Sequence, residues 1–245
     1  MSELTQQELT AKIVASLNTL RALVATIDAA AAAEPSALPG WSRAHLLAHI
    51  DGFARAATRQ LESIGATEPF PMYDGGAEGR NNAIELLALM RADALVERVD
   101  QSLAALGSGV NAIKAEHWEL ATGFRGAGSV AELFEAIWRE SVIHSSDLLR
   151  SHSPANWEPE FNAHLFTELA SRVPKSKRYI LQPHGAQRIS LGSGDEAVVL
   201  SGTDFDLAAW LAGRQPLGPV QATAGADGAD LPELGPWPSG LKAPN

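Results

Sequence analysis

The sequence predicts an α+β protein, in which a bundle of four long helices precedes a small α/β unit. Two observations support this fold class. In the earlier part of the chain, apolar side chains recur at steps of three and four residues, the period of amphipathic helices. Later come short β-prone runs bounded by glycine, proline and aspartate. We therefore expect a helix bundle over residues 1–153 and an α/β domain with a Pro/Gly-rich tail over residues 154–245.

The first two predicted helices have recognisable ends. The first covers Thr5 to Ala33, carries an apolar stripe and finishes in an alanine run, after which Pro35 stops it. The second covers Trp41 to Ile64, where the Ser42 hydroxyl is available to cap the first turn and Gly65 ends the helix. These two segments supply the first half of the bundle.

The other two predicted helices follow a long loop. Residues 66–79, "ATEPFPMYDGGAEG", are rich in turn-forming residues and longer than a plain connection needs. A third helix is expected from Arg80 to Leu106, and a fourth from Ser129 to Arg150. The fourth begins with "SVAEL", in which a serine and a glutamate three residues later form a capping box.

The second half of the chain has a different pattern. The runs "RYILQP" at 178–183, "QRISLG" at 187–192 and "EAVVLSG" at 196–202 predict three short strands, and "DFDLAAWLAG" at 204–213 predicts a helix. From Pro216 onward the chain is rich in proline and glycine, which favours a tail that wraps over a surface or stays partly disordered.

Composition and charge exclude several classes of protein. With 19 Lys and Arg against 29 Asp and Glu, the formal charge of −10 repels nucleic acid and anionic lipid. The N-terminal residues do not resemble a signal peptide, and no apolar run reaches the ~18 residues of a membrane span. We expect a cytoplasmic protein without nucleic-acid or membrane partners. Because the chain has no cysteine, any thiol chemistry or metal ligation needs other groups.

Two histidines lie four residues apart on the second predicted helix. The apolar residues Leu46, Ile50 and Phe53 define the direction that faces the bundle. His49 falls near the edge of this face, whereas His45 lies further round the helix. His49 is therefore the better candidate for a ligand that points into the bundle.

The fourth predicted helix carries a carboxylate and an imidazole at matching spacing. His144 projects into its apolar stripe, and Glu140 lies one turn earlier, so the two side chains stack on one face. If the second and fourth helices face each other, His49, Glu140 and His144 form a set of two histidines and one glutamate. Such a set leaves Zn²⁺ an open coordination position, as in catalytic zinc sites.

The same residues admit simpler interpretations. A histidine on an apolar face is usually a core or capping residue, Glu140 and His144 can share an ordinary hydrogen bond, and His45 with His49 can supply both ligands or neither. Arg80 and Arg214 can each bind an acidic substrate or only occupy a helix end. The large indoles are interpreted as core residues rather than cofactor platforms.

Several motifs resemble one known family. "GWSRAHLLAHI", "PMY" followed by "RN", and "WRESVIHSSDLL" are similar to the bundle motifs of the mycothiol-dependent maleylpyruvate isomerase family of actinobacteria, and "LAGR" is similar to a motif of its C-terminal domain. The resemblance implies a DinB-like metal-binding four-helix bundle followed by a small α/β domain of sterol-carrier type. It is strongest in the bundle, and the tail here runs on further than in the family.

The resemblance also implies a site and a reaction. The metal ligands are expected to be His49, Glu140 and His144, with zinc as the metal; Arg214 is expected to be catalytic and to bind the thiol cosubstrate mycothiol, and Arg80 to be catalytic. The implied reaction is cis–trans isomerisation of maleylpyruvate to fumarylpyruvate by a monomer, through reversible addition of the thiolate. A metal- and mycothiol-dependent S-transferase acting on another small metabolite, and a non-catalytic bundle that binds metal or thiol, are the alternatives.

Overall fold

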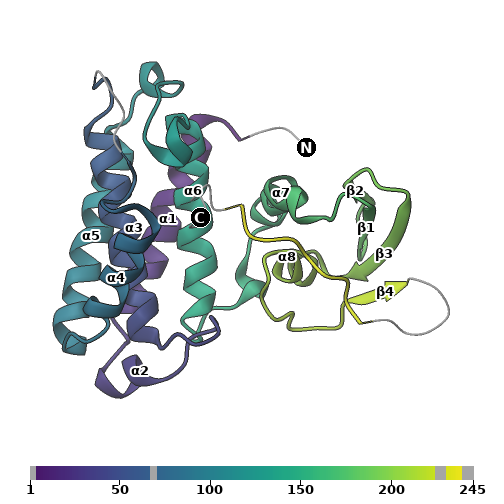
Figure 1. The fold of residues 1–245 in the computed structure, drawn as a ribbon, viewed down its shortest axis with the longest axis horizontal. Helices are drawn as coiled ribbons and strands as arrows, with labels where there is room; N and C mark the ends of the chain where they lie inside the picture. Colours follow the sequence, from purple (N-terminus) through teal and green to yellow (C-terminus); the bar gives the residue numbers. More distant parts are fainter. Residues whose placement is uncertain (1–3, 67–70, 224–229, 239–245) are drawn as a thin grey trace. The chain divides into compact units, whose positions relative to one another are not determined.

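The computed structural model describes residues 4–66, 71–223 and 230–238, which form two compact units, one up to Ser151 and one from His152 (Figure 1). Among the helices of the described residues, none is both long enough and apolar enough to cross a membrane.

The first unit is a helix bundle. In Figure 1 its four longest helices lie side by side, α1 and α3 each contacting both α5 and α6. The helices of this unit are α1 (Gln6–Val24), α2 (Ala29–Ala33), α3 (Arg43–Glu62), α4 (Gly76–Leu87), α5 (Ala92–Ala112) and α6 (Val130–Asp147). Short 3-10 turns follow α5, at Ala115–His117 and Phe124–Gly126. The predicted bundle is confirmed.

The predicted apolar stripes form the core of this bundle. On α6, Val130, Leu133, Phe134 and Ile137 are completely buried. Full burial of one such side chain contributes about 1.5–3 kcal/mol. The predicted caps are also present: the Ser42 hydroxyl accepts a hydrogen bond from the first turn of α3, and Ser129 forms the capping box of α6.

The predicted helix from Thr5 to Ala33 is wrong as one continuous element, because the chain turns after α1 and restarts as α2. The Asp28 carboxylate accepts a hydrogen bond from the Ala31 amide at 2.8 Å and caps α2. An aspartate that bonds nearby backbone in this way favours a helix start over a helix interior. Ile27 is buried within the turn, so the apolar pattern continues across the break and conceals it.

The predicted helix from Arg80 to Leu106 is also two helices. It begins earlier, at Gly76 in α4, breaks after Leu87 and resumes as α5. At the break, Leu89 is 83% exposed, and Arg91 takes an extended ψ before the first turn of α5. Because the apolar residue at this point faces solvent instead of the core, packing does not favour a straight helix here.

The start of α4 depends on glycine. Gly75 and Gly76 both have positive φ, which turns the chain sharply into the helix. A Cβ at Gly79 would lie 2.1 Å from the Asp74 carbonyl oxygen, so only glycine fits there without movement. Part of the predicted 66–79 loop, residues 67–70, lies outside the described residues.

We expect Gly79→Ala to lower the melting temperature by a few degrees, since overpacking of this kind costs about 1–3 kcal/mol. The matched control is Gly52→Ala in α3, where a Cβ would meet nothing within 4 Å. There the better helix propensity of alanine raises stability by up to about 1 kcal/mol. Thermal unfolding of both variants tests the pair, and equal shifts would contradict the assigned role of Gly79.

The second unit contains a four-stranded sheet with the order β2-β1-β3-β4. Its central strands β1 and β3 run parallel, and the outer strands pair antiparallel to them. The elements are α7 (Pro159–Glu168), β1 (Lys177–Pro183), β2 (Ile189–Leu191), β3 (Glu196–Gly202), α8 (Asp204–Leu211) and β4 (Gln221–Thr223), with 3-10 turns at Pro154–Asn156 and Leu169–Arg172. Helix α8 packs on β1 and β3 (Figure 1).

The three predicted strands and the predicted helix of this unit are confirmed, but α7 and β4 are additions to the prediction. β4 lies in the segment expected to wrap over a surface or to stay partly disordered. Further on, the Gly235 amide bonds the Arg172 carbonyl oxygen at 2.7 Å, and the Tyr179 hydroxyl donates to the Glu233 carbonyl oxygen at 2.8 Å. This part of the tail is therefore fixed to the second unit, whereas residues 224–229 and 239–245 lie outside the described part of the chain.

Candidate metal centre

Hydrogen bonds at one end of the bundle hold the start of α3 beside the end of α6. The buried Arg43 guanidinium donates from Nε to the Leu148 carbonyl oxygen at 2.6 Å. In the loop before α3, the Ala37 amide donates to the Asp147 carbonyl oxygen at 2.9 Å. These contacts bring the second turn of α3 next to the last turns of α6, where the predicted ligands lie.

The structure brings His49, Glu140 and His144 together. The His49 Nε2 lies 3.1 Å from the Glu140 Oε2 and 2.9 Å from the His144 Nε2, and the His144 Nε2 lies 3.0 Å from the same Glu140 oxygen. Tetrahedral zinc ligands, each about 2.0–2.1 Å from the metal, are about 3.3 Å apart. Two imidazole nitrogens and one carboxylate oxygen at these separations fit a single divalent cation.

The three side chains differ in their protonation. Burial lowers the pKa of His49 to about 4, so this ring is neutral at pH 7. Burial also opposes charge on His144, but hydrogen bonds to Asp147 and Glu140 outweigh it and raise its pKa to about 9. For Glu140 the effect of burial is overcome by hydrogen bonds from both histidines, which hold its pKa well below the usual value. A cation that binds here displaces the proton from His144.

Asp147 orients the His144 ring through a hydrogen bond to Nδ1. No role was predicted for Asp147 from the sequence. Its carboxylate is fully buried and lies 2.8 Å from the His144 Nδ1, which donates to it. This bond keeps a hydrogen on Nδ1 and turns Nε2 toward the cluster of His49, Glu140 and His144, so that Nε2 can bind a cation once it gives up its own hydrogen, the usual arrangement behind a metal-binding histidine. The spacing was informative, because residues three apart share a helix face.

We expect Asp147→Asn to weaken zinc binding by about 10-fold to 100-fold, because loss of such a supporting carboxylate loosens the ligand that it orients. The substitution keeps the shape of the side chain, so the bundle still folds. Competition with a chromophoric chelator measures the affinity. Asp100→Asn, in the more exposed pair with Arg21, is the control and should leave zinc binding unchanged.

Arg80 and Tyr73 border the cluster. The Arg80 Nη2 donates to the His49 Nδ1 at 3.1 Å and its Nη1 to the Asn81 Oδ1 at 3.0 Å. The guanidinium carbon lies 5.9 Å from the centre of the Tyr73 ring. Burial, together with the charge of Glu140, raises the pKa of Tyr73 to about 12. A neutral phenol and a cation therefore lie beside the candidate ligands, and only Arg80 was singled out from the sequence.

His45 lies apart from the cluster. Its Nδ1 is 2.7 Å from the Ser42 hydroxyl, and its Nε2 is 3.6 Å from a Glu85 carboxylate oxygen. The alternative in which His45 and His49 act as a ligand pair is therefore not favoured by the geometry. Trp41 packs against His49 with ring centres 5.8 Å apart.

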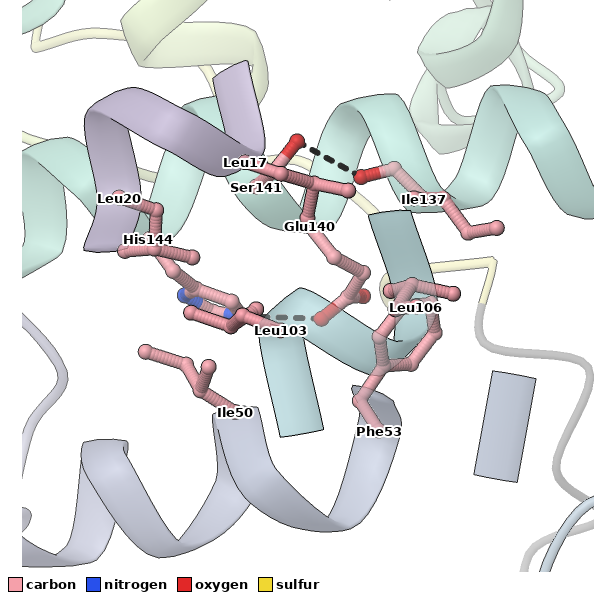
Figure 2. Close-up of a pocket in the computed structure, with 10 residues that line it drawn as sticks. All are labelled: Leu17, Leu20, Ile50, Phe53, Leu103, Leu106, Ile137, Glu140, Ser141 and His144. Atoms are coloured by element: carbon pink, nitrogen blue, oxygen red, sulfur yellow. Dashed lines mark hydrogen bonds and ion pairs between the residues drawn. The ribbon is translucent and has the colours of Figure 1, made fainter. Parts of the chain in front are cut away.

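An apolar pocket lies beneath the carboxylate. Figure 2 shows Glu140 and His144 reaching from α6 toward Ile50 and Phe53 of α3. Most of the remaining lining residues are leucines, and the volume of the pocket is about that of a single water molecule. The pocket is lined by Leu17, Leu20, Ile50, Phe53, Leu103, Leu106, Ile137, Glu140, Ser141 and His144. This apolar lining explains why burial affects the ionisation of the cluster so strongly.

Arg214 lies in the second unit, just after α8. Its Nη1 donates to the Ala212 carbonyl oxygen at 2.8 Å. Arg214 therefore places a positive charge at the C-terminus of α8, one of the two roles considered from the sequence. Its guanidinium carbon lies 5.8 Å from the centre of the Trp237 ring, and that of Arg172 lies 5.7 Å from the same ring. Trp210, on α8, is buried, as expected of a core residue.

A bundle that holds two imidazoles and one carboxylate on facing helices defines a class of proteins suited to bind one divalent cation with room for a further ligand. The family model described as the mycothiol maleylpyruvate isomerase N-terminal domain matches residues 14–149, more than half of the chain. The chain belongs to this family, which is a family of enzymes.

Solved structures support the same fold. A crystal structure of the mycothiol-dependent maleylpyruvate isomerase, and one of a histidine-to-alanine mutant, each match with a TM-score of 0.85. The identity is 23%, and each match covers 97% of this chain and 100% of the other. At this identity the likeness establishes the α+β architecture. No curated protein matches this chain significantly.

Proposed function

We propose that the protein is a zinc- and mycothiol-dependent isomerase that converts maleylpyruvate to fumarylpyruvate. The observation that carries this proposal is the convergence of the His49 Nε2, Glu140 Oε2 and His144 Nε2 within about hydrogen-bonding distance, in a chain of this family. The closest pair of these atoms is 2.9 Å apart.

The residues of the cluster suit this role. His49, Glu140 and His144 would hold the zinc ion, with Asp147 orienting one imidazole. When bound, zinc supplies positive charge that lowers the pKa of a thiol entering its open position. Because the chain has no cysteine, that thiol must come from a cosubstrate.

The reaction needs positive charge from the protein as well. Addition of the thiolate to the cis carbon–carbon double bond forms a carbon–sulfur bond and leaves a single bond that can rotate. Elimination of the thiolate then restores the double bond in the trans form. Arg80, beside the cluster, is suited to bind a substrate carboxylate or the enolate oxygen, because a guanidinium makes strong paired hydrogen bonds to such groups. We assign Arg214 the second anion-binding role and contact with the thiol.

Metal analysis followed by an ultraviolet assay tests the proposal. Purified protein is expected to contain about one zinc per chain and to isomerise maleylpyruvate only when mycothiol is present, with the thiol recovered unchanged. Consumption of the thiol with formation of a conjugate would instead identify an S-transferase. Zinc-loaded protein that leaves both compounds unchanged would support a non-catalytic binding role and overturn the proposed reaction.

A further inference from the structure

Arg80 donates a hydrogen bond to the His49 Nδ1, the ring nitrogen that points away from the cluster. We infer that binding of a divalent cation releases Arg80 from His49, so that the same event that fills the metal site frees a guanidinium beside it. This inference rests on the proposed function, because it takes His49 as a ligand through Nε2. The inference adds to that function a coupling between cation binding and the availability of Arg80 to an anion.

The argument starts from the hydrogen on the imidazole. A guanidinium only donates hydrogen bonds, so the His49 Nδ1, 3.1 Å from the Arg80 Nη2, must accept. A neutral imidazole has one N–H, and in this arrangement it lies on Nε2, directed at the Glu140 Oε2 3.1 Å away. The Nε2 lone pair that a cation needs is therefore not available while Arg80 is bound.

Ligation through Nε2 reverses this pattern. The ring then carries its hydrogen on Nδ1, which would face an N–H of Arg80 at the present separation. Two donors cannot share one hydrogen bond, and a bound cation adds repulsion toward the guanidinium. The Arg80 side chain must therefore leave His49 when the site fills.

The other histidine does not have this conflict. The His144 Nδ1 donates to the Asp147 carboxylate, so the hydrogen that this ring keeps when Nε2 binds a cation is already on the nitrogen away from the cluster. The two imidazoles thus face opposite kinds of partner, a carboxylate behind His144 and a guanidinium behind His49. Of these two contacts, only the hydrogen bond between Arg80 and His49 is therefore coupled to cation binding.

The released guanidinium remains near the site. Asn81, the next residue, accepts a hydrogen bond from the Arg80 Nη1, and the guanidinium lies over the Tyr73 ring. A substrate carboxylate is then a better partner for Arg80 than the protonated Nδ1. By thermodynamic reciprocity, an anion that binds Arg80 strengthens cation binding, just as the cation makes Arg80 available to the anion.

Zinc affinity of Arg80→Met tests this coupling directly. Methionine keeps an unbranched side chain but cannot donate to His49, so we expect zinc to bind about tenfold more tightly than to the wild-type protein, as for loss of one competing hydrogen bond. Arg91→Met is the control, because it removes the same charge from an exposed ion pair with Asp93 and should leave affinity unchanged. Chelator competition measures all three proteins, and circular dichroism checks their folding.

Two further measurements separate the coupling from a general charge effect. Long-range proton–nitrogen NMR of the metal-free wild-type protein is expected to show the His49 hydrogen on Nε2, and zinc should move it to Nδ1. Maleate, a stable cis-dicarboxylate, should strengthen zinc binding to the wild-type protein more than to Arg80→Met. Unchanged or weaker zinc binding by folded Arg80→Met would overturn this inference alone, whereas a wild-type protein that takes up no zinc would overturn the proposed function as well.

Discussion

Replacement of His49 by alanine is expected to remove tight zinc binding and isomerase activity together. The variant keeps only one imidazole and one carboxylate, and the affinity should fall by more than about a hundredfold, since even the loss of a supporting residue costs up to that much. Turnover should fall with it, because a bound zinc ion would supply the positive charge that ionises a cosubstrate thiol near neutral pH. Zinc content after dialysis and the ultraviolet assay measure the two effects.

His45→Ala is the matched control for this substitution. It removes an identical side chain from the same helix, one turn earlier, where the ring contacts Ser42 instead of the cluster. Zinc content and turnover should stay close to the wild-type values. Both variants should unfold cooperatively, because the apolar core of the bundle is unchanged. Stoichiometric zinc retained by folded His49→Ala would refute the ligand assignment.

Replacement of Arg214 by alanine is expected to lower turnover on the order of a hundredfold while zinc content stays the same. Loss of one positioned donor to a developing negative charge typically has an effect of this size. The side chain lies in the second unit, where Trp237 and the carbonyl oxygen of Ala212 hold it. Steady-state kinetics in both maleylpyruvate and mycothiol distinguish a catalytic role from thiol binding.

Arg188→Ala provides the comparison for Arg214, because this arginine is exposed on the same unit and its removal changes the net charge equally. Its kinetics should match those of the wild-type protein. Normal turnover by Arg214→Ala would remove this residue from the mechanism, and loss of zinc in the same variant would show that the substitution acts on the bundle instead.

Periodicity predicted which helix faces are buried better than it predicted where helices break. The stripe on α6 is correct residue by residue, because burial of Val130 or Phe134 follows directly from a repeat of three and four. The breaks after α1 and α4 were not predicted, because an apolar repeat by itself does not mark where a helix breaks. At Ile27 the pattern continues through a turn, and only the capping geometry of Asp28 distinguishes the turn from a helix interior.

The candidate site shows the same limit. His49, Glu140 and His144 could be grouped from spacing, since each lies at a defined angle on its helix. Tyr73 could not, because it comes from a loop whose path depends on the glycines at the start of α4. The pairing of Arg80 with His49 was also not predictable, since the position of α4 depends on the same loop and glycines. The role of Arg214 stays a prediction.

The short strand β4 has a practical consequence for shortened forms of this chain. It pairs with β3 along one side of the sheet, and without it the backbone N–H and C=O groups of that side would be left open. Open strand edges recruit other chains, so truncation ahead of Gln221 should promote aggregation. Trimming the proline-rich end further along would instead remove Trp237, whose ring centre lies 5.8 Å from the Arg214 guanidinium carbon, and would change the surroundings of Arg214 within the second unit.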